Sequence, residues 1–320
     1  MKPQTAGNTP GAPGSERPRR ATAGARAVTR AQLSRQPRGD RLKGTIFFSL
    51  LLFALSLALL GLVAIIVQAA VKGAPAFSTD LITNGPSTIN PEQSGFRPAL
   101  LGTLYLIVGV IVLVVPLGVS AAIYLEEYAD GTRWWNKLIE LNVQNLAGVP
   151  SIIYGILGLA FIVRGPLDLG FILAAGSMTL ALLVLPTVIL AAREAIRAVP
   201  PSIREGSLAL GATQWQTIRR QVLPAAIPGV VTGVILAISR AIGETAPLLL
   251  VGAATFVTFS PTFFGDNGYT ALPVLIFNYA ARPQDEFRVL AAAGVILMLV
   301  VLLAMNSFAI WLRNRYEQQW

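Results

Sequence analysis

The sequence predicts an all-α membrane protein with six transmembrane helices, and three observations support this class. First, 54% of the 320 residues are hydrophobic and only 13% are charged, whereas soluble domains carry about 25% charged residues. Second, several segments with almost no charge reach the length of about 20 residues that crosses a bilayer core. Third, Lys and Arg are concentrated in alternate segments between these stretches.

The spans can be placed along the chain from the charges that bound them. The first is expected at 44–71, where 28 uncharged residues separate Lys43 from Lys72. A cleavable signal peptide has an apolar region of only about 7–15 residues, so this segment is predicted to remain as a helix. After an extracytoplasmic loop at 72–97, a transmembrane core at 98–312 holds the other five helices, at about 98–125, 141–163, 169–192, 225–251 and 289–312.

The basic residues predict the orientation of these helices. If the N-terminus is inside, 19 Lys and Arg residues lie in inside segments and five in outside segments. Loops on the cytoplasmic side of a membrane carry such an excess. Both termini are therefore predicted to be cytoplasmic, and the inside segments are 1–43, 126–140, 193–224 and 313–320.

Residues 1–43 are predicted to be a disordered basic tail. They hold ten Lys and Arg residues against Glu16 and Asp40, with many Pro, Gly and Ala residues and no aromatic side chain. Such a segment cannot bury enough apolar surface to fold. We interpret it as a tail that helps set topology and lies near anionic lipid. The alternative, a nucleic-acid-binding arm, lacks the aromatic side chains on which bases stack.

The composition argues against an enzyme. The chain has no Cys and no His, which removes thiol chemistry and the commonest metal ligand and general base. A phosphate-binding P-loop needs a Gly-Lys pair, and none of the four lysines follows a glycine. We therefore expect no catalytic, cofactor-binding or metal site in this chain, and an intramembrane hydrolase remains only a remote alternative.

The segment 202–224 is a polar interruption between two apolar spans. Pro200 and Pro201 prevent the fourth span from continuing as helix. Ser202 and Glu205 have the spacing of a capping box, which predicts a short helix that starts at this point. Gly211 stands where that helix needs a left-handed residue to end.

A second short helix is predicted directly after this glycine turn. Thr213 and Gln216 form another capping-box pattern, and the helix is expected to end at Leu223 and Pro224. Two helices around a glycine turn would make a rigid exposed surface suited to a soluble partner. Each residue taken singly also has a purely structural explanation, as a cap, a turn or an interfacial side chain.

Arg240 and Glu244 place two charges inside the fifth span. Arg240 lies 13 residues beyond Ile227, or roughly 20 Å along a helix, and Glu244 follows one turn later on the same face. A charge at that depth costs at least about 2.5–3.5 kcal/mol and is a functional candidate. We interpret Arg240 as the group that meets an oxyanion in transit, with a structural ion pair as the alternative.

The spacing of the 202–224 segment resembles the E-A-A-x3-G-x9-I-x-L-P loop of ABC importer permeases. In that family the loop contacts the ATPase subunit. Three residues depart from the pattern: Gly206 and Ser207 replace the two alanines, and Gln221 replaces the isoleucine. The residues that carry the resemblance are Glu205, Gly206, Ser207, Gly211, Leu223 and Pro224.

Longer segments resemble the A-type permease of phosphate-specific ABC importers over about residues 96–320. They are GTLYLIVGVIVLVVPLGVSAAIYLEEYA at 102–129, LAGVPSIIYGILGL at 146–159, SRAIGETAPLL at 239–249, ALPVLIFNYA at 271–280 and the terminal RNRYEQQW. The resemblance implies a type I ABC importer permease fold with a cytoplasmic coupling helix. It also implies that Arg240 and Glu244 take part in phosphate passage.

The same resemblance implies a complex in the cytoplasmic, or inner, membrane of a prokaryote. Its other members would be a paralogous C-type permease, two ATP-binding subunits that hold ATP and magnesium, and an extracytoplasmic phosphate-binding protein. The expected partners are these proteins, phosphate and membrane lipid, without nucleic acid. Two alternatives stay open: a permease for sulfate, molybdate or phosphonate, and a secondary transporter.

Overall fold

The computed structural model describes residues 38–87, 89–253, 257–265 and 268–316. The chain divides into two units, residues 1–65 and 66–320. Most of the predicted basic tail lies outside the described residues. Its last residues are helical, because α2 (Arg38–Gly73) begins before the expected start of the first span.

The described part of the first unit is the N-terminal portion of α2. Its large apolar side chains are exposed along the whole helix, as Phe47 at 67% and Phe53 at 69% illustrate. A helix that is apolar all round is stable only where lipid or protein surrounds it. This segment therefore has the properties of a membrane span.

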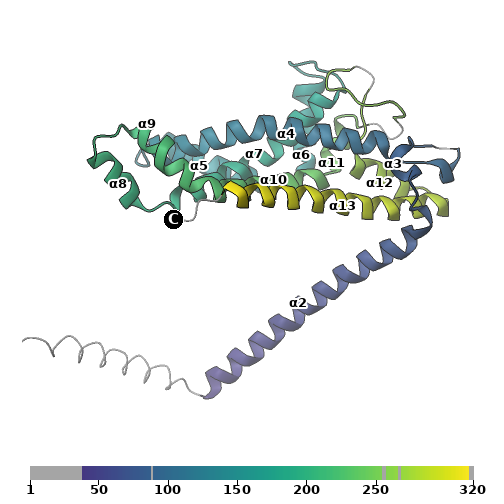
Figure 1. Ribbon diagram of the computed structural model, residues 1–320, viewed down its shortest axis with the longest axis horizontal. Helices are drawn as coiled ribbons and strands as arrows, with labels where there is room; N and C mark the ends of the chain where they lie inside the picture. The colour runs from purple at the N-terminus through teal and green to yellow at the C-terminus, as the bar shows by residue number, and fades with distance from the viewer. Residues whose placement is uncertain (1–37, 88, 254–256, 266–267, 317–320) are drawn as a thin grey trace, which may run out of the picture. The chain divides into compact units, whose positions relative to one another are not determined.

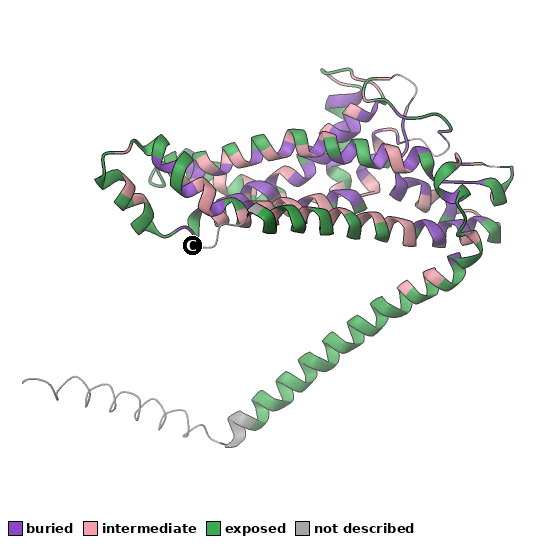
Figure 2. Cartoon of the chain, in the orientation of Figure 1, coloured by how far each residue is buried: buried purple, intermediate pink, exposed green. Residues whose placement is uncertain are grey.

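The second unit is built around α7 (Leu173–Arg197), which packs against α4 (Arg97–Ile123) and α10 (Leu223–Gly243). A further long helix, α13 (Asp285–Tyr316), runs beside α10 (Figure 1). Figure 2 shows that buried residues concentrate where these helices face one another. The central core is apolar, and α7 contributes most to it, with Leu173, Leu180, Leu183, Val184 and Val188.

Shorter elements connect and close this bundle. Three of them are π-helical turns: η3 (Tyr124–Tyr128), η4 (Gly158–Val163) and η5 (Ile218–Val222). The others are η1 (Ala74–Ala76), α3 (Asp80–Thr83), η2 (Pro91–Gln93), α5 (Trp134–Ala147), α6 (Ser151–Leu157), α8 (Pro201–Ala209), α9 (Gln214–Thr217), α11 (Ala246–Leu250) and α12 (Leu272–Ala280).

The second unit has two ends, each with its own apolar cluster. We call the end that carries η3, α8 and α9 the loop end, where Ala192, Ile196 and Val222 are buried together. We call the other the far end, where α3, α12 and the start of α13 pack around Phe96 and Tyr279.

The third span is not the single helix that we predicted at 141–163. Helix α5 begins earlier, at Trp134, and the chain bends by 108° between Ala147 and Ser151 before α6 and η4 continue. Pro150 explains the bend, since proline cannot extend a helix and pushes the residue before it out of the helical region. Beyond the bend, Gly155 lets α6 approach α11 closely, because an added Cβ would lie 2.7 Å from the Pro247 Cα atom.

The fifth span also differs from the continuous helix predicted at 225–251. Helix α10 ends at Gly243, Glu244 has extended backbone angles, and α11 starts at Ala246 with a proline in its first turn. Proline is favoured at that position because its missing N–H has no partner there anyway. The other spans shift by a few residues at their ends, so that α7 runs past 192 and α13 extends over both sides of 289–312.

Within the described residues, five helices are long and apolar enough to cross a membrane, and the bent pair α5 and α6–η4 would make a sixth. This agrees with the predicted all-α class of six spans. The candidate sites from the sequence lie at two levels of this bundle. The 202–224 segment is at the loop end, and the Arg240–Glu244 pair spans the point where α10 ends, with Arg240 on its last turn and Glu244 just beyond it.

Candidate functional site

The 202–224 segment begins with α8, but its start differs from the prediction. Pro200 is the N-cap and Pro201 the first helical residue, and no side chain caps this end. The predicted capping box of Ser202 and Glu205 is therefore wrong, because Pro201 moves the helix start upstream and places Ser202 inside the first turn. In the part of the chain that the structure describes, the exposed Glu205 makes no ion pair, so its carboxylate is available to a partner.

The turn between the two short helices has the predicted form. Gly211 has a φ of +84°, and the N–H groups of Gly211 and Ala212 donate to the carbonyls of Leu208 and Ser207. These two bonds are those of a Schellman motif, which needs a left-handed residue at the glycine position. The second capping box is confirmed, since the Thr213 side chain accepts from the Gln216 N–H while the Gln216 side chain accepts from the Thr213 N–H.

The second short helix does not end at Leu223 and Pro224 as predicted. From α9 the chain passes through η5 into α10, so that 214–243 forms one continuous helical span. Proline is tolerated in the first turn of an α-helix, and the π-helical turn supplies such a start for Pro224. Leu223 and Pro224 are half-buried at the base of this helix.

We call α8, the 210–213 turn and α9 the knob. Within it the Ser207 and Thr217 hydroxyls are 2.9 Å apart, a hydrogen bond that joins its two helices. Gly206 is exposed, and an added Cβ would meet no atom within 4 Å. No contact among the described residues requires glycine at that position. The missing side chain leaves room for another protein to approach closely.

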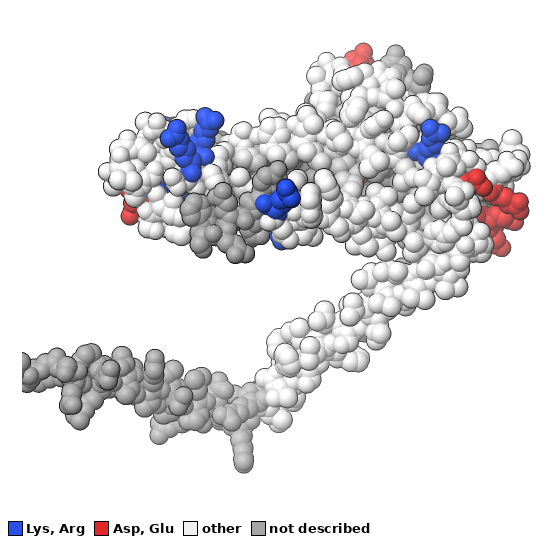
Figure 3. Space-filling model, in the orientation of Figure 1, with Lys and Arg blue, Asp and Glu red and all other residues white. Residues whose placement is uncertain are grey.

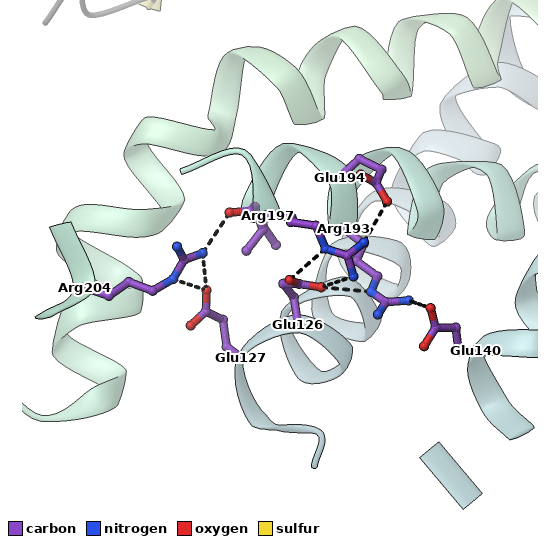
Figure 4. Close-up of polar contacts among 8 residues, drawn as sticks. Glu126, Glu127, Glu140, Arg193, Glu194, Arg197 and Arg204 are labelled. Carbon is purple, nitrogen blue, oxygen red and sulfur yellow. Dashed lines mark hydrogen bonds and ion pairs between the residues drawn. The ribbon is translucent and has the colours of Figure 1, made fainter. Parts of the chain in front are cut away.

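A network of ion pairs lies beside the knob and joins the end of α7 to η3 and to the middle of α5 (Figure 4). The Arg193 guanidinium, only 11% exposed, contacts the Glu126 carboxylate at 2.9 Å and the Glu140 carboxylate at 2.7 Å. Arg197 contacts Glu126 at 3.1 Å. Two arginines of α7 are thereby tied to η3 and α5. Their charges are neutralised by these carboxylates at the loop end of the bundle.

The turn that precedes α5 brings Glu140 into this network. The Thr132 N–H and hydroxyl both donate to the Asp130 carboxylate, at 2.9 and 2.7 Å. These hydrogen bonds hold the pKa of the Asp130 carboxyl below its usual value. The Asn136 side chain donates to the Asp130 backbone carbonyl at 2.9 Å, which fixes the first turn of α5 against this loop.

Arg204 of α8 is the second centre of contacts at the loop end. Its guanidinium contacts the Glu127 carboxylate at 2.8 Å and also donates to the Val199 carbonyl at 2.6 Å and the Ile196 carbonyl at 2.8 Å. Ile196 lies in the last turn of α7, where carbonyls lack intrahelical partners, and Val199 lies just beyond it, so Arg204 holds the end of this helix.

Sequence reasoning did not find this network. The pair Glu126–Glu127 at the end of one span and the basic residues at the end of another are visible as charge patterns. The pairing between them cannot be read from the sequence. Glu126 and Arg193 are 67 positions apart and Glu127 and Arg204 are 77 apart, and both pairs come together only through the packing of α4 on α7. The residues that the sequence missed are Glu126, Glu127, Glu140, Arg193, Arg197, Arg204 and Gln214.

The Arg240–Glu244 pair lies at the point where α10 ends. The Arg240 Nε and Glu244 Oε1 atoms are 3.5 Å apart, and the side chains are 45% and 17% exposed. Next to Arg240, the Ser239 hydroxyl lies 2.7 Å from Asn306 of α13. The 3.5 Å between Arg240 and Glu244 is long for a hydrogen bond, so the carboxylate satisfies the guanidinium only in part. Donors of Arg240 therefore stay available to another group.

The structure does not bring the two candidate sites together. They are joined by α10, which places Arg240 roughly 24 Å from Pro224 along a helix that rises 1.5 Å per residue. On the face drawn in Figure 3, the largest group of basic side chains lies at the loop end and most of the acidic side chains lie at the far end, with smaller charged groups elsewhere. Most of the surface between them is uncharged.

These features define a multi-pass membrane protein with a polar knob at one end and a charged pair where α10 ends. Residues 114–318 match the family described as the inner membrane component of binding-protein-dependent transport systems. The chain belongs to this family.

Particular relatives refine this class. The chain is 38% identical over 228 residues to the phosphate transport system permease protein PstA 1 of Mycobacterium tuberculosis (strain CDC 1551 / Oshkosh), covering 70% of this chain and 72% of that protein. It is 37% identical over 240 residues to PstA of Haemophilus influenzae, covering 74% and 82%. It is 34% identical over 278 residues to PstA of Yersinia pestis, covering 84% and 89%.

Solved structures share the fold at much lower identity. A bacterial ABC transporter for the acidic polysaccharide alginate superposes with a TM-score of 0.60 at 18% identity, over 87% of this chain and all of that one. The MetNI methionine ABC transporter gives 0.56 at 17% identity, over 69% and 95%. The bundle is therefore the fold of type I ABC importer permeases, as the sequence predicted.

Replacing Arg193 with Ala is expected to lower the thermal stability of the detergent-solubilised protein. The change leaves two carboxylates without their main partner at a poorly solvated helix junction, and we expect a loss of roughly 2–3 kcal/mol, below the range for fully buried pairs. Arg288→Ala is the matched control, because Arg288 and Asp285 are 61% and 90% exposed and such pairs contribute about 0–1 kcal/mol. Equal melting temperatures for the two variants would show that the network adds no stability.

Proposed function

We propose that the chain is the membrane-spanning permease subunit of an ATP-driven importer of inorganic phosphate. Family membership supports the permease role, and the identity of 34–38% to proteins named as phosphate permeases supports the substrate. The structural observation that carries the proposal is the Arg240 guanidinium, which is 45% exposed on a membrane helix and incompletely paired with Glu244.

The chemistry of Arg240 suits a tetrahedral oxyanion. Guanidinium is planar, keeps its charge and can donate two parallel hydrogen bonds to phosphate oxygens. Because lipid cannot solvate this charge, the exposed side of Arg240 must face water or protein. Glu244 keeps the empty site close to neutral, and phosphate would compete with it for the guanidinium donors.

In this proposal the loop end faces the cytoplasm, as the distribution of basic residues indicates. The knob contacts an ATP-binding subunit through Glu205 and Gly206, and the continuous 214–243 helix links that contact to Arg240. ATP and magnesium are held by the partner ATPase subunits. The remaining partners are a second, paralogous permease subunit and an extracytoplasmic phosphate-binding protein.

Two alternatives make different predictions about this chain. A permease for sulfate, molybdate or phosphonate would use the same oxyanion chemistry at Arg240. A secondary transporter would not need the knob, and no ATPase subunit would co-purify with it in mild detergent.

Uptake of radiolabelled anions by cells that lack the gene tests the proposed substrate. We expect phosphate uptake at micromolar concentration to be lost and to return when the gene is supplied on a plasmid, while sulfate uptake stays unchanged. Loss of sulfate uptake with normal phosphate uptake would replace the proposed substrate with sulfate.

Arg240→Gln is expected to abolish phosphate uptake while the complex still assembles, because Gln is neutral and cannot attract the anion. The measurements are radiolabelled uptake and recovery of the ATPase subunit with the tagged chain. Arg288→Gln, which removes an exposed arginine at the far end, serves as the control. Normal uptake in the Arg240 variant would assign the Arg240–Glu244 pair a structural role only.

Glu205→Lys is expected to uncouple ATP hydrolysis from transport without unfolding the subunit. Glu205 is exposed and unpaired within the described residues, so its charge reversal acts at the contact with the ATPase. The ratio of phosphate imported to ATP hydrolysed in proteoliposomes should fall. Glu92→Lys reverses an equally exposed charge at the far end and should leave the ratio unchanged; a normal ratio in both variants contradicts the coupling role of Glu205.

A further inference from the structure

The knob has a third attachment to the bundle besides its two covalent connections. The chain enters it from α7 and leaves it through η5 into α10. In addition, both of its helices contact the same residue, Glu127, in the π-helical turn η3 that continues α4. Arg204 of α8 contacts the Glu127 side chain at 2.8 Å, and Gln214 of α9 donates to the Glu127 backbone carbonyl at 2.6 Å.

This attachment is well shielded from water. The Glu127 side chain is only 9% exposed and that of Arg204 21%. The Arg204 Nε and a terminal nitrogen both donate to the same Glu127 oxygen, and the terminal nitrogens also donate to the carbonyls of Ile196, in the last turn of α7, and Val199, just beyond it. A charged pair that is sheltered and held by extra hydrogen bonds keeps one geometry far better than an exposed pair.

The helix that Glu127 terminates reaches the centre of the bundle. Helix α4 packs along α7 over its length and also contacts α10. Its residues Leu106, Val110 and Val114 lie in the central apolar cluster. A displacement of the knob that reaches Glu127 therefore moves a helix of the core directly and does not depend only on α7 and α10.

We propose that Glu127 is the positioning residue that couples the knob to α4, through Arg204 and Gln214 acting together as a clasp. The clasp stays closed during the transport cycle, so that the knob, η3 and the end of α4 move as one body. This inference rests on the proposed function and deepens it, because it names the route by which movement of an ATPase subunit enters the membrane core.

The first test removes the clasp carboxylate in the complete complex, reconstituted in proteoliposomes with its partner subunits. Glu127→Ala should lower the phosphate imported per ATP hydrolysed about tenfold, equivalent to roughly 1.4 kcal/mol of coupling, while the subunits still assemble. Glu194→Ala is the matched control, since the Glu194 side chain is 68% exposed and, among the described residues, forms its ion pair within its own helix, with Arg197. An identical ratio in both variants would overturn the clasp.

The second test restores the attachment by a different chemistry. The chain has no Cys, so the double variant Glu127→Cys, Arg204→Cys supplies its only two thiols. A short bifunctional methanethiosulfonate reagent should join the two thiols. The cross-linked sample should then import more phosphate per ATP hydrolysed (the import ratio) than the reduced sample, and dithiothreitol should reverse the gain. A cross-link that forms but blocks turnover would show that the clasp must open, which contradicts the proposal.

These outcomes also separate the clasp from the function on which it rests. If the wild-type complex imports no phosphate, the proposed function is wrong and the role of Glu127 is overturned with it. If the wild-type complex imports phosphate and neither Glu127→Ala nor the cross-link changes the import ratio, the function stands and only the clasp is wrong.

Discussion

The structure depends on one constraint: the hydrocarbon core of a membrane offers no water to a charged side chain. In the described part of the chain, charged groups therefore gather at the two ends of the bundle, where carboxylates and guanidinium groups neutralise one another. The loop-end network forms between helices that are distant in sequence, because each helix brings its charges to the same boundary. Arg240 and Glu244 stand apart from this arrangement, and their placement where α10 ends is what makes them candidates for transport.

The length of the apolar segments and the residue types at the turns made much of this fold predictable. The spans follow from segments long enough to cross a bilayer, and Gly211 and Thr213 occupy positions that only a few residue types fill well. The errors have local causes too. Two of them show that the effect of a proline depends on its surroundings: Pro150 bends a predicted helix by 108°, whereas Pro224 is accommodated in a helix that continues past it.

The ion pairs beside the knob could not be predicted in the same way. Glu127 and Arg204 are 77 residues apart, and nothing in either local sequence selects that partner among the many charges at the same membrane boundary. Their pairing is fixed by the close packing of α4 on α7, a tertiary property. The site residues that sequence reasoning identified are thus those with a local motif, and the ones it missed are those whose role comes from assembly of the bundle.

The π-helical turn η5 (Ile218–Val222) has a further geometric consequence. A π-helical turn carries about one residue more than an α-helical turn, and each residue of an α-helix turns the chain by roughly 100°. The extra residue therefore sets the angle through which the knob is rotated about the α10 axis. The face of α10 that bears Arg240 therefore has a fixed orientation, as well as a fixed distance, relative to the face of the knob that bears Glu205.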